Sequence, residues 1–464
     1  MKAIIYKDWV NFFRDKSICA SVLICALATM IVSLSIPTVY HLGDGPLIYK
    51  IVFSTLAPII GSLVPLFYTL TITNSIKEDG DLEVYYQSGK NMFGYYIARS
   101  IVPLIIATVI TAIMVIVYII YKPYNIEWVI TYDTFGVLLN TLTMVFLMSE
   151  FILLSLLFFK DGIVVGMLAV LPLLGYGSLT SIYLTRKTLI TVLTVLICLI
   201  TALISKFITN KKFIGHFGPI TGSSIITCRN IKFGYKKNKP ILKDLQLECE
   251  PNEPLGILGH NGVGKTTLLK VIVGLLRENN GSVVINGQQI SQMKDILLLT
   301  EASNLTPKMT VRENIMFRKL LFDPDGAIQN YTEDNDMVKS YGLTNYLDTK
   351  VSDLSSGLKK RVGIALGLMF HPKLVLLDEP TNSIDTQTKQ LLMETVILLD
   401  EAGRTVITVT HDLEYCFKTC KRVVLIDNGT VSKDVKVSSF NDFDEFQKAV
   451  DYDKPVEKLK LSSL

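Results

Sequence analysis

Six long apolar stretches in the first 206 residues constrain the fold of this chain more than any other feature. A helix rises about 1.5 Å per residue, so about 20 apolar residues cross the roughly 30 Å hydrocarbon core of a bilayer. The chain is 49% hydrophobic, and its mean hydropathy of +0.40 is high for a soluble protein. The sequence therefore predicts an α-helical six-span transmembrane domain over residues 17–206, with spans near residues 17–36, 51–74, 93–120, 134–158, 163–183 and 188–206.

The distribution of basic residues predicts the orientation of this domain. Six crossings place both of its ends on the same side of the membrane. If that side is the cytosol, the internal segments carry more lysine and arginine than the external ones, as the positive-inside rule requires. We therefore expect a multi-pass protein of the plasma membrane, with short external connections and with its remaining half in the cytoplasm.

Two segments outside the spans have amphipathic patterns. Residues 1–16 are predicted to form an interfacial helix on the inner leaflet, with its charged residues away from the apolar face; a solvated extension is the alternative. Residues 75–92 alternate acidic and apolar side chains, and we expect a cytosolic coupling segment that contacts the following domain. The apolar face of the first segment consists of Ile4, Ile5, Trp9, Phe12 and Phe13.

Two charged residues, Arg99 and Glu150, lie inside predicted spans near their cytosolic ends. Ionisable groups inside membrane helices are rare, and they are usually paired or functional. The two residues can pair with each other. A salt bridge that pins helices and a contact with substrate both remain open interpretations.

The net charge and the cysteines give no support for binding of nucleic acid or of zinc. A net charge of +4 gives no basis for nucleic-acid binding, because a small basic excess is equally suited to anionic lipid. The seven cysteines are scattered without the spacing of a disulfide framework, so we expect reduced thiols. Cys416 and Cys420 share one helical face, but two thiols without further ligands seldom bind zinc.

The composition changes near residue 210, where the apolar stretches end. A mixed linker over residues 207–223 precedes residues 224–430, in which β-rich runs alternate with helical runs, as a parallel α/β sheet requires. Residues 431–464 are short and charged, and we expect a C-terminal tail that forms a small cap or stays partly disordered. The chain is thus predicted to have a membrane domain followed by an α/β domain.

A P-loop occupies residues 259–266, which read GHNGVGKT. A predicted strand over residues 254–259 leads into it, and a predicted helix over residues 266–276 follows, which is the context that the motif requires. Backbone N–H groups of such a loop surround phosphates, the Lys265 ammonium reaches the β- and γ-phosphates, and the Thr266 hydroxyl binds Mg²⁺. The predicted nucleotide contacts are Gly259, Asn261, Gly262, Val263, Gly264, Lys265, Thr266 and Thr267.

A second apolar strand, predicted over residues 374–379, ends in two adjacent carboxylates. Asp378 is placed to hold Mg²⁺, and Glu379 is placed to polarise the water that attacks the γ-phosphate. Together with the P-loop, this strand predicts a site for ATP or GTP that uses Mg²⁺.

Further motifs follow in an order and spacing that resemble the ABC ATPase family over residues 227–428. Residues 354–358, which read LSSGL, resemble the signature sequence of that family, and residues 383–385 resemble its D-loop. His411 is similar to the switch histidine at the end of a strand, and Tyr235 stands where an aromatic ring stacks on adenine. The resemblance implies an α/β P-loop ABC ATPase domain, in which His411 assists the hydrolysis of ATP.

The same resemblance implies that the chain works as a dimer with an identical or related half-transporter. Each ATP then lies between the P-loop of one subunit and the signature sequence of the other. The residues expected to reach the partner's nucleotide are Ser355, Ser356, Gly357 and Asp385.

Three positions depart from the family pattern. Ser356 replaces a usual glycine and Leu358 replaces a frequent glutamine, so contact across the dimer is expected to be weaker. Residues 298–301 align with the Q-loop, where Glu301 occupies the glutamine position. Glu301 can accept a hydrogen bond from water or ligate Mg²⁺, so it is a candidate both for catalysis and for the metal site. A glutamate here resembles the variant Q-loop of bacterial transporters for lantibiotics and related peptide antibiotics.

The membrane half resembles ABC-2-type exporters in its six spans, its interfacial helix and its acidic coupling segment. It departs from them because the membrane domain comes first and because residues 184–187 leave no room for re-entrant helices. Exporters with long cytosolic extensions of their spans are the alternative architecture. We expect export of a hydrophobic or amphipathic substrate, first an antimicrobial or toxin-like peptide and otherwise a lipid or drug. The rival hypothesis is a membrane ATPase that senses a ligand without transporting it.

Overall fold

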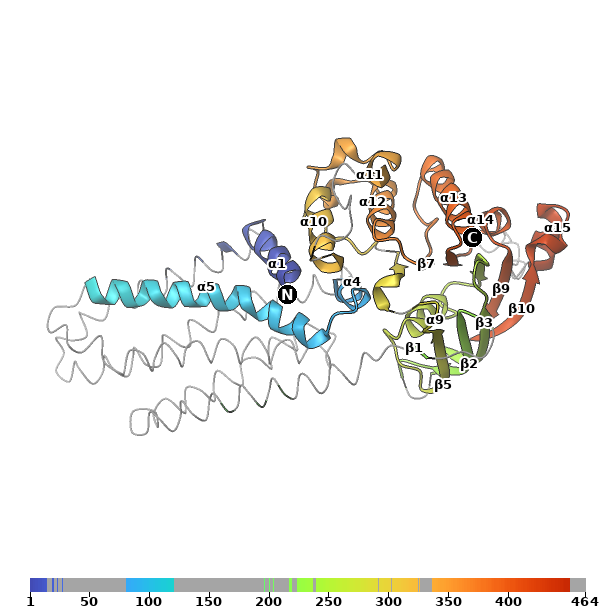
Figure 1. Cartoon of the computed structure of the whole chain (residues 1–464), viewed down its shortest axis with the longest axis horizontal. Coiled ribbons are helices and arrows are strands. Elements are labelled where there is room, and N and C mark those ends of the chain that lie inside the picture. The colour runs from blue at the N-terminus through green and yellow to red at the C-terminus, as the bar shows by residue number, and fades with distance from the viewer. Residues whose placement is uncertain are drawn as a thin grey trace, which may run out of the picture. The chain divides into compact units, whose positions relative to one another are not determined.

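The computed structural model of the chain divides into two compact units (Figure 1). Unit 1 comprises residues 1–81 and 90–211, and unit 2 comprises residues 82–89 and 212–464. The structure describes residues 1–14, 19, 20, 23, 27, 81–120, 196, 200, 203, 217, 218, 223–236, 239–290, 292–301, 303–323, 325 and 336–450.

The described helices of unit 1 are α1 (Lys2–Arg14) and α5 (Met92–Ile120). Helix α5 covers the third predicted span and contains Pro103. In the part of the chain that the structure describes, no helix combines the length and the hydropathy that a membrane crossing needs. The other five predicted spans lie almost wholly outside the described residues.

Helix α1 packs on α5 through a face that carries charged side chains. Lys7 and Asp8 are buried together with Ile4, whereas Trp9 and Phe13 are 43% and 63% exposed. Of the predicted apolar face, Ile4 is thus buried, whereas Trp9 and Phe13 remain exposed.

A buried ion pair explains why α1 turns its charged residues inward. The Asp8 carboxylate accepts a hydrogen bond from the Arg99 guanidinium, which also donates to the Tyr95 hydroxyl oxygen at 3.0 Å. A buried guanidinium needs such a counter-ion, because an unpaired charge in the interior is very costly. Burial raises the pKa of Asp8 to about 6, against the attraction of Arg99 and Lys7. Arg99 thus pairs with Asp8, and Glu150 lies outside the described residues.

A six-stranded sheet in the order β10-β9-β4-β8-β7-β6 forms the core of unit 2. Five of its strands are parallel, and β10 runs antiparallel to β9 at the edge. Every residue of β4, β6, β7 and β8 is buried, as strands of a parallel sheet covered on both faces require. The bounds are β4 (Leu255–Leu258), β6 (Ile296–Leu299), β7 (Leu374–Asp378), β8 (Thr405–Val409), β9 (Arg422–Asp427) and β10 (Thr430–Lys436).

A second, four-stranded sheet has the order β1-β5-β2-β3. Its strands are β1 (Phe217–Gly218), β2 (Ile226–Phe233), β3 (Leu242–Cys249) and β5 (Asn280–Asn286). The short β1 pairs in parallel with the end of β5, and it lies inside the segment that we expected to be a linker. The α/β domain therefore begins before residue 224.

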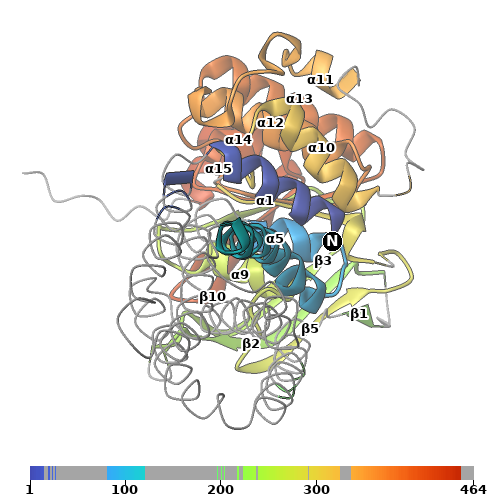
Figure 2. The ribbon, with the colours of Figure 1, turned by 90° about the vertical axis from the view of Figure 1, so that its left-hand side faces the viewer.

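Helices α10, α11, α12 and α13 gather at one end of unit 2, whereas the four-stranded sheet, with α9 beside it, lies at the other end (Figure 1 and Figure 2). The α-helices are α4 (Asp81–Gln87, of which residues 82–87 belong to this unit), α9 (Lys265–Ile272), α10 (Val311–Phe322), α11 (Asp336–Ser340), α12 (Ser356–Leu368), α13 (Thr386–Glu401), α14 (Leu413–Thr419) and α15 (Phe443–Val450). The 3-10 helices are η2 (Met293–Asp295), η3 (Thr344–Tyr346), η4 (Val351–Asp353) and η5 (Val437–Ser439).

Two glycines allow α12 to pack closely on the strand β6 and the turn that follows it. A Cβ atom at Gly367 would lie 2.6 Å from the Leu297 side chain, and one at Gly363 would lie 2.8 Å from Ser303. Such distances are too short for carbon atoms, so only glycine permits this approach. The contact matters for function because β6 leads directly to Glu301.

The C-terminal part of the chain folds onto unit 2 instead of forming a tail at residue 431. Strand β10 extends the sheet, and Phe446 of α15 is fully buried among Phe417, Phe440 and Phe443, with ring centroids 5.4 to 6.5 Å apart. The prediction of a tail rested on the charge of the segment and did not consider these aromatic residues. Their burial stabilises the folded segment despite its charge. Residues 451–464 lie outside the described part.

Candidate functional site

The predicted P-loop forms the turn between β4 and α9, as its sequence context requires. Gly262 and Gly264 have φ angles of 82° and 112°, a region that residues with a side chain rarely adopt. Gly264 is also the N-cap of α9, where a Cβ atom would lie 2.7 Å from Ile241 Cγ2. Helix α9 ends at Ile272, four residues before the predicted helix end.

Lys265 lies at the start of α9 with its ammonium buried against the loop. Its Nζ donates to the main-chain oxygens of Gly259 and His260 at 2.7 and 3.3 Å. It also forms an ion pair with Glu379 Oε1 at 3.2 Å. The ammonium therefore lies between the P-loop and the end of β7, where it can neutralise an anionic group held by the loop.

Thr266 and Asp378 form the candidate metal site. The Thr266 hydroxyl donates to Asp378 Oδ1 at 2.9 Å, which joins the first turn of α9 to the last residue of β7. Burial raises the pKa of Asp378, and the hydrogen bond from Thr266 opposes this rise. A hydroxyl and a carboxylate are hard oxygen ligands of the kind that Mg²⁺ prefers, so these residues fit that ion.

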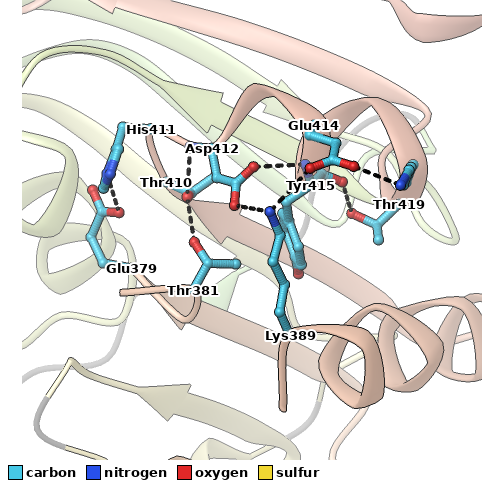
Figure 3. Close-up of polar contacts among 10 residues, drawn as sticks. Glu379, Thr381, Lys389, Thr410, His411, Asp412, Glu414, Tyr415 and Thr419 are labelled. Carbon is cyan, nitrogen blue, oxygen red and sulfur yellow. Dashed lines mark hydrogen bonds and ion pairs between the residues drawn. The ribbon is translucent and has the colours of Figure 1, made fainter. Parts of the chain in front are cut away.

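Glu379 is held from two sides by basic residues. Its Oε2 lies 3.0 Å from His411 Nδ1 (Figure 3), while its Oε1 contacts Lys265. Its main-chain N–H donates to Val409 O at 2.8 Å, because β7 and β8 are neighbours in the sheet and end together. Glu379 is 8% exposed and His411 remains half exposed, so the carboxylate is oriented and still close to solvent, as a general base must be.

A lysine that the sequence motifs did not identify contacts the segment around Glu301. Glu301 follows β6, is exposed, and accepts at Oε1 from Asn382 Nδ2 at 3.5 Å. Lys360, on α12, donates to the main-chain oxygen of Glu301 at 3.1 Å and is 3% exposed. Burial lowers the pKa of Lys360 to about 8, against the attraction of Glu301, Asp378 and Glu379.

Helical periodicity was the signal that could have identified Lys360. It precedes Gly363 and Gly367 by three and seven residues, so all three lie on the face of α12 that packs on β6. A lysine on a buried helical face next to predicted carboxylates is a functional candidate.

Residues 82–89 contact the same part of unit 2. The Gln87 side-chain amide donates to Leu298 O at 3.0 Å and accepts from Leu298 N at 3.2 Å. Glu83 forms an ion pair with Lys270 of α9 at 2.8 Å. The segment is therefore bound to the strand that precedes Glu301 and to the helix that begins at Lys265.

The signature and D-loop residues lie together in the structure. Ser355 is the N-cap of α12, the Ser356 hydroxyl donates to Ser383 O, and Gly357 lies against the Asp385 carboxylate. Asp385 in turn is the N-cap of α13, where its carboxylate accepts from the N–H of Thr388 at 2.8 Å. Among the described residues, no hydrogen bond joins these groups to the P-loop of the same chain.

The remaining predicted nucleotide contacts differ in exposure. Asn261 and Gly262 are exposed, Val263 is partly buried, and Thr267 is buried at the start of α9. Tyr235 is 56% exposed and packs edge-on against Phe233, with ring centroids 5.1 Å apart. An exposed aromatic ring is suited to stacking on a planar base.

A lysine on α13 links the D-loop helix to the region of His411. Lys389 Nζ forms ion pairs with Asp412 Oδ2 at 2.7 Å and with Glu414 Oε2 at 3.4 Å (Figure 3). Asp412 directly follows His411 and is the N-cap of α14, accepting from Tyr415 N at 2.9 Å. Lys389 therefore restrains the backbone that carries His411.

We expect Lys389→Met to lower the kcat for ATP hydrolysis about threefold to tenfold with little change in KM. A partly buried ion pair contributes about 1 kcal/mol, and its loss here loosens the position of His411. Steady-state ATPase assays measure the effect. Lys418→Met, which removes a more exposed partner of Glu414, is the matched control and should retain wild-type turnover.

The second half of the chain is similar in sequence to known ATP-binding proteins. A family model described as ABC transporter matches residues 242–382. The chain is 35% identical over 198 residues to a nitrate import ATP-binding protein of Synechococcus elongatus, covering 41% of this chain and 30% of the relative. It is 32% identical over 211 residues to a linearmycin resistance ATP-binding protein of Bacillus subtilis, covering 44% of this chain and 67% of the relative.

Among solved structures, a dimeric ATP-binding cassette bound to ADP and phosphate is 26% identical with a TM-score of 0.42, covering 46% of this chain and all of that one. In the sequence comparisons, the chain spans less than a third of the nitrate import protein and about two thirds of the linearmycin resistance protein.

Proposed function

Because the chain belongs to the ABC transporter family of ATP-binding proteins, whose ATPases couple ATP hydrolysis to transport, we propose that it is a half-transporter that exports a hydrophobic or amphipathic compound. The compound would leave from the cytosol or the inner leaflet. The observation that carries the ATPase part is the position of Glu379, held by Lys265 and His411 beside Asp378.

The proposed roles follow from these contacts. ATP would supply the phosphoanhydride bond that is hydrolysed. Thr266 and Asp378 are suited to hold the Mg²⁺ ion that accompanies it. Lys265 neutralises the phosphates, while Glu379 orients and deprotonates the attacking water. His411 keeps the Glu379 carboxylate in place through the contact at 3.0 Å.

A second chain would complete each nucleotide site. Ser355 and Ser356 are exposed, and the Ser356 hydroxyl is oriented by the D-loop residue Ser383. Gly357 and Asp385 lie in the same cluster. This cluster supports a dimer in which it faces the nucleotide on the P-loop of an identical or related partner.

Residues 82–89 are the proposed mechanical link to the membrane half. They are bound to unit 2 through Gln87 and Leu298 and through Glu83 and Lys270. A nucleotide-dependent movement of the segment around Glu301 would therefore be transmitted to the connection between the second and third predicted spans.

Sequence features support the membrane and substrate parts of the proposal. The six apolar stretches of residues 17–206 favour an ABC-2-like membrane domain, placed in the plasma membrane of a bacterium with the ATPase in the cytoplasm. Glu301 resembles the variant Q-loop of peptide-antibiotic exporters. One relative is named for resistance to linearmycin and another for import of nitrate, and the first agrees with outward transport of an antimicrobial compound.

Transport into inside-out vesicles tests the proposal. Vesicles that contain the wild-type chain should accumulate a labelled lantibiotic in the presence of ATP and Mg²⁺, and vesicles with Glu379→Gln should not. A labelled phospholipid and a labelled amphipathic drug, assayed in parallel, distinguish the alternative substrates. Ligand-stimulated ATP hydrolysis without accumulation of any probe would instead identify a sensor that does not transport.

A further inference from the structure

Lys360 is a buried cation for which the ATPase chemistry above has no role. Lys360 lies five residues after Ser355, the N-cap of the signature helix α12. Its side chain donates to the main chain at Glu301, which follows the C-terminal end of β6. Only 3% of the residue is exposed. Burying an ammonium is costly unless acceptors or opposite charges compensate for the lost water.

Three carboxylates provide this compensation. Glu301, Asp378 and Glu379 all attract the Lys360 ammonium, and the main-chain oxygen of Glu301 accepts its hydrogen bond at 3.1 Å. Lys265, by contrast, is bound to the P-loop and pairs with Glu379. Both buried lysines thus interact with Glu379, and Lys360 is in addition hydrogen-bonded to the segment at Glu301.

The need for a second cation follows from the charge of Glu301. An amide at this position would be neutral, whereas the carboxylate adds a third negative charge near Asp378 and Glu379. ATP itself is a polyanion, so an uncompensated carboxylate here would repel the nucleotide as well as its neighbours. Lys360 is the side chain that both hydrogen-bonds the Glu301 segment and carries the opposite charge.

We propose that Lys360 is a positioning residue that holds the turn at Glu301 and offsets the charge of its carboxylate, which allows a glutamate to act in the nucleotide site. The proposal rests on the assignment of the ATPase site above. It predicts that the importance of Lys360 depends on the charge at residue 301.

A double-mutant cycle on the purified full-length chain tests this dependence. Lys360→Met should lower kcat/KM for ATP about tenfold in the wild-type background. In the Glu301→Gln background the same change should cost less than about twofold, because no extra charge remains to be offset. Lys373→Gln is the matched control, since Lys373 also donates to a main-chain oxygen at 3.1 Å but is exposed and remote from the carboxylates.

The Mg²⁺ concentration that gives half-maximal activity provides a second readout. Lys360→Met should lower it several-fold when residue 301 is glutamate, because the uncompensated carboxylate attracts Mg²⁺ more strongly, and leave it unchanged when residue 301 is glutamine. A purely structural lysine would not produce this difference. An equal loss in both backgrounds, including loss through misfolding, overturns the proposal, as does no loss in either. Absence of ATP turnover in the wild-type chain would instead contradict the ATPase assignment.

Discussion

Glu379→Gln is expected to reduce steady-state ATP turnover by a factor on the order of 10² to 10³ while nucleotide binding is retained. Removal of a well-positioned general base costs about this much, and glutamine cannot accept the proton of the attacking water. The substitution preserves the size of the side chain, and its carbonyl oxygen can still contact Lys265. Phosphate release with saturating ATP and Mg²⁺ measures the loss.

The binding state of this variant adds a second expectation. With hydrolysis blocked, ATP should hold two chains together, so size-exclusion chromatography in detergent should show a more stable ATP-dependent association than in the wild type. Glu394→Gln changes an exposed glutamate of α13 and should leave turnover unchanged. Turnover near the wild-type rate in Glu379→Gln would assign the base to another residue.

Lys265→Met is expected to weaken ATP binding itself, by a factor on the order of 10 to 100. The ammonium is the buried cation bound to the P-loop, and a buried charged hydrogen bond to an anion contributes about 1.5 to 3 kcal/mol. Equilibrium binding of a fluorescent ATP analogue measures the affinity, and turnover should fall with it.

The comparison with Glu379→Gln separates binding from chemistry. Glu379→Gln should bind ATP and not hydrolyse it, whereas Lys265→Met should do neither at ordinary ATP concentrations. Lys294→Met, an exposed lysine of η2, is the control and should bind normally. Unchanged affinity in Lys265→Met would contradict the phosphate-binding role of the loop.

The sequence predicted the central part of the candidate site because its motifs are local. The strand, loop and helix around Lys265 are contiguous, and their glycines have no substitute at these φ angles. Asp378 and Glu379 stand at the end of a strand that reads as continuously apolar, and the structure places this strand inside the sheet, between β8 and β6. Parallel strands end at the same edge, so these residues and His411 meet.

Element ends were less predictable than element types. Helix α9 ends earlier than its sequence pattern indicates, β1 begins within the expected linker, and α15 folds where a tail was expected. Each boundary depends on contacts with distant segments, such as Ile285 for β1 and Phe417 for α15. A local pattern does not contain those partners.

The apolar stretches of the first half and the ATPase motifs of the second were thus determined by sequence alone, because hydropathy and phosphate binding both depend on residues close together in the chain. The tertiary structure decided which distant charges meet. Asp8 is paired with Arg99 across 91 positions of sequence, and Lys360 reaches Glu301 across 59. The physical reason is that a buried charge requires a counter-charge or acceptor, and only the packing of α1 on α5 and of α12 on β6 determines which one is within reach.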